Sequence, residues 1–150
     1  MLPVESVVPK PLLQYIEGLK AHDIDLIAST FADDIRFVTP AKTMEKEEIL
    51  EFLSALYRGF PDWSYAHEEP VLFESGIIGI KWRQEGKHTG RLEFAGFEGV
   101  PPTRKFVKIP EHYFYYRVAS NQLTEIRPDP IPGGAPRGIF EQIGVDLPPL

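Results

Sequence analysis

The order of the helical and strand patterns is the feature that most constrains the fold of this chain. Apolar side chains at helical spacing fill the first part of the chain, beginning with Leu12, Tyr15, Ile16 and Leu19. The expected helices cover residues 12–19, 24–31, 43–60 and, after the strands, 136–143. Strand patterns are expected over 35–38, 63–73, 77–84, 106–118 and 122–127. Helices gathered first and strands later predict an α+β fold, because α/β folds alternate the two.

This order predicts one architecture for residues 1–150, treated as a single domain. A strongly curved antiparallel sheet closed at one end by the N-terminal helices forms a cone, and a cone has an interior. Aromatic residues make up 12% of the chain, more than strand faces alone require, which indicates a lined apolar pocket. The length of 150 residues is enough to bury a core without disulfides.

Local signals predict several details of the elements. Asp23 and Thr43 precede helical patterns, and both residue types are favoured as N-caps. Pro110 falls within the longest strand pattern, where it predicts a break or a bulge. Ser120 and Asn121 predict a hairpin turn between the last two strands.

Composition excludes several classes of function. The formal net charge is −6, so the chain lacks the surplus of Lys and Arg that nucleic-acid binding needs. It has no cysteine, its four histidines show no short metal-ligand spacing, and it has no glycine-rich phosphate loop. We therefore expect no metal and no cofactor. No apolar run approaches a membrane span and no secretory signal opens the chain, so a cytoplasmic protein is expected.

Four segments in register resemble one known family, the SnoaL-like polyketide cyclases of the nuclear transport factor 2-like superfamily. They are Gly86-Lys87-His88-Thr89-Gly90, Pro101-Pro102-Thr103, the hairpin from Tyr116 to Glu125, and Gly138-Ile139-Phe140-Glu141-Gln142-Ile143-Gly144. The resemblance covers the chain from about Leu12 to Gly144. It implies the cone-shaped fold, a hydrophobic substrate, no cofactor and a homodimer or higher homo-oligomer.

The resemblance also implies a catalytic carboxylate after the hairpin, which removes a proton next to a carbonyl so that the enolate closes a ring by aldol addition. Counted from Val118 and Leu123, the family position falls on Pro128, and Asp129 is the nearest carboxylate. A histidine of the family that steadies the oxyanion corresponds to Phe114. His112 shares the face of Phe114 because side chains alternate along a strand, so Asp129 and His112 are the expected catalytic pair. Glu111 is the alternative carboxylate, since a bulge at Pro110 would decide whether it or His112 points inward.

The expected substrate-binding residues are aromatic side chains with two polar companions. They are Tyr15, Phe37, Trp63, Trp82, His88 and Arg127. For each aromatic residue the alternative is an ordinary place in the core. For His88 the alternative is a structural role between its flanking glycines, and for Arg127 it is a pair with Glu125 at the rim.

Three kinds of function remain open from the sequence. The first is a cyclase or isomerase acting on a small hydrophobic carbonyl compound, with hydrolysis of an epoxide or lactone as a variant. The second is a binding protein that uses the same pocket without catalysis. The third is a protein-interaction role for the outer sheet face, to which Tyr113, Tyr115 and Arg117 are expected to belong.

Overall fold

The computed structural model describes residues 8–73, 76–94 and 97–145. Two helices come first, α1 (Lys10–Ala21) and α2 (Ile24–Ser29), followed by strands β1 (Phe31–Val38) and β2 (Thr43–Met44) and helix α3 (Lys46–Gly59). The later strands are β3 (Ser64–His67), β4 (Val71–Leu72), β5 (Ile78–Lys87), β6 (Leu92–Phe94), β7 (Phe97–Val100), β8 (Phe106–Ala119) and β9 (Gln122–Pro128). Helix α4 (Arg137–Gln142) follows. The predicted α+β class is confirmed.

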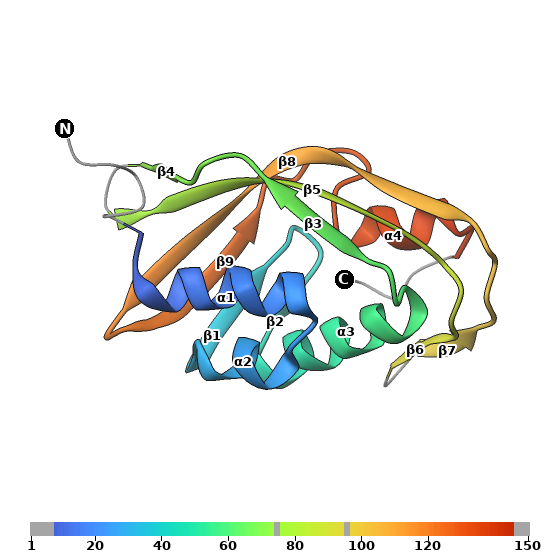
Figure 1. Ribbon diagram of the computed structural model, residues 1–150, viewed down its shortest axis with the longest axis horizontal. Coiled ribbons are helices and arrows are strands. Elements are labelled where there is room, and N and C mark those ends of the chain that lie inside the picture. The colour runs from blue at the N-terminus through green and yellow to red at the C-terminus, as the bar shows by residue number, and fades with distance from the viewer. Residues whose placement is uncertain (1–7, 74–75, 95–96, 146–150) are drawn as a thin grey trace.

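The main sheet runs in the order β2-β1-β9-β8-β5-β3, with β4 also paired to β5. Its neighbours are antiparallel except β1 and β9, which are parallel, so the sheet is mixed and not wholly antiparallel as predicted. In Figure 1 the curved sheet lies over α1, α2 and α3, which cover one face together, while α4 lies beside the far end of β8. The sheet does not close into a barrel. The curvature of the sheet and the helices that cover it enclose an interior, as predicted for a cone-shaped sheet.

The predicted stripe of α1 is buried, because Leu12, Tyr15, Ile16 and Leu19 all face the sheet. Asp23 caps α2 as predicted, and its Oδ1 accepts a hydrogen bond of 3.0 Å from the Leu26 N–H. The prediction for Thr43 is wrong, since Thr43 lies in β2. A capping box between Glu45 and Glu48 begins α3 instead, because Glu48 also accepts the free N–H of Glu45.

A bulge at Pro110 confirms the prediction for the long strand. Trp82 of β5 pairs with His112 of β8, whereas Gln84 pairs with Ile109, so β8 contains one residue more than β5 between these two pairs. A bulge redirects the side chains next to it. Here it leaves His112 buried and Glu111 exposed on the outer face, 3.8 Å from the Lys81 ammonium.

Candidate functional site

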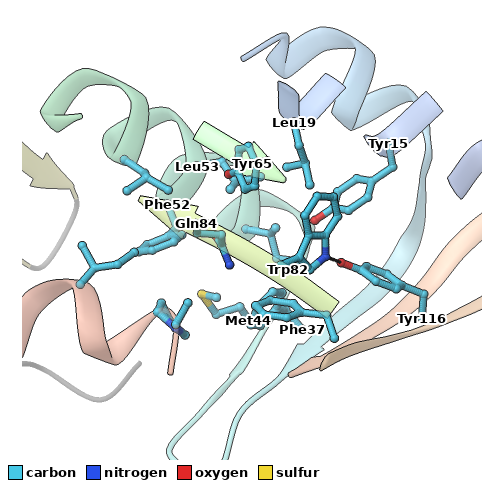
Figure 2. Close-up of a pocket in the computed structure, with 16 residues that line it drawn as sticks. Tyr15, Leu19, Phe37, Met44, Phe52, Leu53, Tyr65, Trp82, Gln84 and Tyr116 are labelled. Atoms are coloured by element: carbon cyan, nitrogen blue, oxygen red, sulfur yellow. Dashed lines mark hydrogen bonds between the residues drawn. The ribbon is translucent and has the colours of Figure 1, made fainter. Parts of the chain in front are cut away.

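An apolar cavity lies between the sheet and the helices that cover it (Figure 2). It is lined by Tyr15, Leu19, Phe37, Met44, Ile49, Phe52, Leu53, Leu56, Tyr65, Trp82, Gln84, Phe114, Tyr116, Ala135, Pro136 and Ile139. None of these lining residues in the described part of the chain carries an acidic or basic side chain. The volume open to the centres of water molecules is about 40 Å³, room for few waters. A ring-sized ligand therefore requires the lining side chains to move apart.

Two tyrosines and a tryptophan form a polar group at one side of the cavity. The indole N–H of Trp82 donates to the Tyr116 hydroxyl over 2.8 Å, and the Tyr15 ring lies beside the Tyr116 ring with centroids 5.7 Å apart. Figure 2 shows these polar atoms close together. The Tyr116 hydroxyl is the acceptor in this bond, so its own hydrogen remains to be donated to a ligand. The bond from Trp82 polarises the hydroxyl and strengthens that donor.

A second phenol pair stands beside the first. The hydroxyls of Tyr57 on α3 and Tyr65 on β3 are 2.8 Å apart, and Tyr57 stacks on His22 with ring centroids 3.9 Å apart. Burial raises the pKa of the Tyr15, Tyr65 and Tyr116 phenols well above the ordinary value. These phenols therefore stay protonated and serve the cavity as neutral hydrogen-bond donors.

Three of the expected binding residues line the cavity, namely Tyr15, Phe37 and Trp82. Trp63 does not line it, but its indole N–H donates to Oε1 of Gln84 over 3.3 Å. Arg127 lies on the outer face of the sheet, where its guanidinium is 3.4 Å from Glu125. That position is the rim pair that the sequence left open as the alternative for Arg127.

His88 is fully buried outside the cavity lining. Its Nδ1 accepts the Thr103 N–H over 3.1 Å and lies 2.8 Å from the Thr103 hydroxyl, while its ring stacks on Phe60 with centroids 5.1 Å apart. The histidine thus joins two of the motifs that carry the family resemblance, the one around Gly86–Gly90 and the one around Pro101–Thr103. This arrangement is the structural role that the sequence left open for His88.

The two expected catalytic residues lie on opposite faces of the sheet. Pro128 pairs with Phe114 and is buried with it, so Asp129 turns to the outer face. There its N–H donates to the Tyr113 carbonyl over 2.9 Å, and its Oδ2 accepts the Tyr115 hydroxyl over 3.3 Å. Asp129 is therefore not among the residues that line the apolar cavity, although it lines a separate surface pocket of about 180 Å³.

His112 faces the interior and is only 3% exposed. Its Nδ1–H donates to the Pro110 carbonyl over 2.8 Å, so the neutral ring carries its free electron pair on Nε2, which has no partner among the described residues. That nitrogen lies 3.3 Å from the point where a Cβ on Gly134 would sit. Phe114, whose ring centroid is 5.0 Å away, and Ala135 both line the cavity, so His112 lies behind residues of the cavity wall.

The polar lining residues Tyr65, Gln84 and Tyr116 are not among those predicted from the sequence. A signal existed for two of them, because Tyr116 continues the alternation of His112 and Phe114, and Gln84 follows Trp82 on the same face. Tyr65 is brought to the cavity by the pairing of β3 with β5, which the chain order alone does not reveal.

The fold is similar to that of a protein with a ketosteroid isomerase-like fold from Catenulispora acidiphila, at 12% identity and a TM-score of 0.64, with 93% of this chain and 95% of that chain covered. Residues 12–126 match the model of the SnoaL-like domain. The chain therefore belongs to the SnoaL-like domain family.

Solved structures support the fold at low sequence identity. AclR, a candidate hydroxylase from Streptomyces galilaeus, has 16% identity and a TM-score of 0.68, with 97% of this chain and 88% of that chain covered. A candidate SnoaL-like polyketide cyclase from Jannaschia has 20% identity and a TM-score of 0.62, with 86% of this chain and 88% of that chain covered. IdmH, a candidate polyketide cyclase from Streptomyces antibioticus, has 18% identity and a TM-score of 0.61, with 79% of this chain and 88% of that chain covered.

A comparison with curated proteins finds no match. Among the helices of the described residues, none has both the length and the apolar character needed to cross a bilayer.

Proposed function

We propose that the protein binds a small hydrophobic carbonyl compound in the interior cavity and accelerates proton removal next to that carbonyl, as a cyclase or an isomerase does. The observation that carries the proposal is the Tyr15–Tyr116–Trp82 group, in which the Tyr116 hydroxyl accepts the Trp82 N–H and keeps its own hydrogen free inside a largely apolar cavity. Membership of the SnoaL-like family and similarity to candidate polyketide cyclases agree with it.

The free phenol hydrogen is suited to the charge that such a reaction creates. When a base takes a proton from the carbon beside the carbonyl, the C–H electron pair forms a C=C bond and the carbonyl oxygen becomes negative. A neutral donor held in an apolar site stabilises that oxygen more than it stabilises the starting ketone, as the oxyanion hole of ketosteroid isomerase does. The enolate carbon then either attacks a second carbonyl and closes a ring or takes a proton at a different carbon.

We assign proton removal to His112 in preference to Asp129. The Pro110 carbonyl fixes the tautomer of His112, so its Nε2 is a base with a free electron pair on the inner face of the sheet. Asp129 is held on the outer face by Tyr115. Because a ligand must already push the lining side chains apart, contact with Nε2 requires only a further shift of the wall formed by Phe114 and the segment at Ala135.

Exchange of α-protons for deuterium tests this function without knowledge of the natural substrate. Acetophenone in deuterium oxide, followed by proton NMR, should lose its methyl signal faster with the protein than with buffer. His112→Asn keeps a side-chain N–H for the Pro110 carbonyl and deletes Nε2, so it should reduce exchange to the buffer rate while binding persists. Asp129→Asn should exchange like the wild type, and loss of exchange in Asp129→Asn alone would transfer the role of the base to Asp129.

A binding protein without catalysis is the second candidate function. It is favoured by the lining of the cavity, which in the described residues holds no carboxylate. Saturable binding of acetophenone by the wild type with exchange no faster than in buffer would select this candidate.

A further inference from the structure

Gln84 of β5 is a second polar group of the cavity, distinct from the phenols. It is only 7% exposed and lies on the inner face with Trp82. A buried primary amide has two N–H donors and an acceptor oxygen, and leaving any of them unpaired is costly. The partners of Gln84 therefore indicate what the cavity is built to hold.

The orientation of the amide follows from its neighbour. An indole N–H can only donate, so the Trp63 N–H at 3.3 Å requires the amide oxygen on its side and directs the NH₂ group away from it. Trp63 is itself 2% exposed and packs against Phe60 with ring centroids 5.2 Å apart, which fixes this arrangement. In Figure 2 the Gln84 nitrogen points into the space that the other labelled side chains surround, and it has no hydrogen-bond partner among the described residues.

The amide and the free phenol hydrogen serve different parts of the cavity. Tyr116 pairs with Ile78 of β5, and Gln84 lies six residues further along that strand, where it pairs with Ile109. Figure 2 likewise shows Gln84 apart from the polar atoms of Tyr15, Trp82 and Tyr116, with apolar side chains such as Phe37 and Met44 lining the cavity between them.

We infer that the ligand carries two oxygen acceptors on one apolar framework, the first bound by the Tyr15–Tyr116 pair and the second by the Gln84 NH₂ group. This inference rests on the proposed function and adds Gln84 to it as the residue that binds the second oxygen. In a ring closure the second carbonyl is the electrophile. Its carbon forms the new C–C bond with the enolate carbon, the C=O electron pair moves to its oxygen, and the Gln84 N–H meets the negative charge that develops there.

Matched ketones with one and two carbonyls test the inference. We would titrate the protein with acetophenone and 1,4-diacetylbenzene, and with 2-acetylnaphthalene and 2,6-diacetylnaphthalene for a longer spacing between oxygens. Both tryptophans of the chain adjoin the site, one through Gln84 and one in the lining, so their fluorescence reports binding. One further hydrogen bond should make the dicarbonyl member of at least one pair bind about three- to tenfold more tightly.

Gln84→Met removes the amide at similar side-chain volume and should abolish this preference. Gln84→Glu keeps an oxygen for the Trp63 N–H, so it should show the same loss even where Gln84→Met fails to fold. Gln14→Met on α1 is the control and should keep the preference, because Gln14 does not line the cavity. A preference that survives in both Gln84 variants, or that the wild type lacks in both pairs, overturns the inference and leaves the proposed function standing. Failure of the wild type to bind any of the four ketones overturns both.

Discussion

Replacement of Tyr116 by phenylalanine removes one oxygen atom from the centre of the cavity group. Tyr116 is 1% exposed, its hydroxyl accepts the Trp82 N–H over 2.8 Å, and its ring lies 5.7 Å from that of Tyr15 between centroids. The Tyr15 hydroxyl can rotate to another acceptor or to water in the cavity. The Trp82 N–H cannot, because it is fixed in the plane of an indole that is only 2% exposed.

The expected cost follows from these two losses. A buried donor left without a partner costs about 1–3 kcal/mol, and a lost hydrogen bond between neutral groups costs about 0.5–1.5 kcal/mol. Burying a phenyl in place of a phenol recovers part of this, so we expect Tyr116→Phe to lower the free energy of unfolding by about 2–3 kcal/mol. With a urea m-value of about 2 kcal/mol/M, the unfolding midpoint should fall by about 1–1.5 M.

Urea unfolding followed by tryptophan fluorescence measures this change, and a double-mutant cycle identifies its cause. In a Trp82→Phe background the stranded N–H is absent, so Tyr116→Phe should cost only about 1 kcal/mol there. Tyr113→Phe on the outer face is the control and should change stability by less than about 0.5 kcal/mol. Equal costs of Tyr116→Phe in both backgrounds would refute the argument that the Trp82 N–H makes this hydroxyl necessary.

Three further predictions follow from other contacts. Burial lowers the pKa of His88 below the ordinary 6.5. Between the folded and the unfolded pKa the unfolded chain binds more protons, so the free energy of unfolding should fall as the pH drops through that window. His88→Asn keeps an acceptor for the Thr103 N–H and should flatten this part of the plot of urea midpoint against pH. A Cβ on Gly90 would overlap the Arg58 carbonyl oxygen, so Gly90→Ala should lower stability by about 1–3 kcal/mol in the same assay. The homodimer remains a prediction, and light scattering should give twice the chain mass for the wild type and the single mass for Tyr115→Glu on the outer face.

The sequence predicted the fold well because its elements depend on local patterns. The stripe of α1, the cap at Asp23 and the bulge at Pro110 each follow from the spacing or chemistry of neighbouring residues, and the structure confirms all three. The prediction of an N-cap at Thr43 was wrong for an equally local reason. Glu45 and Glu48 satisfy each other's backbone groups in a capping box, which outweighs the intrinsic preference for threonine at an N-cap.

The site was harder to predict because a register shift of one residue turns a side chain to the other face of a sheet. Pro128 and Asp129 are adjacent, yet the pairing of Pro128 with Phe114 buries the proline and sends the carboxylate outward. Motif matching found the end of β9 correctly but could not decide between these two faces. For Phe37 and Trp82 the aromatic content was sufficient, since both lie on the inner face and line the cavity, whereas Trp63, predicted on the same basis, does not.

The position of Pro128 also determines what kind of chemistry the cavity can perform. With a proline at the inward position and the carboxylate outside, the described lining offers ligands only neutral donors, the phenols and the Gln84 amide. Because burial raises the pKa of the lining tyrosines, these donors do not change charge near neutral pH, so the affinity for a neutral ketone should stay constant between about pH 6 and 9. An affinity that changed over this range would place a charged group in the cavity and contradict this reasoning.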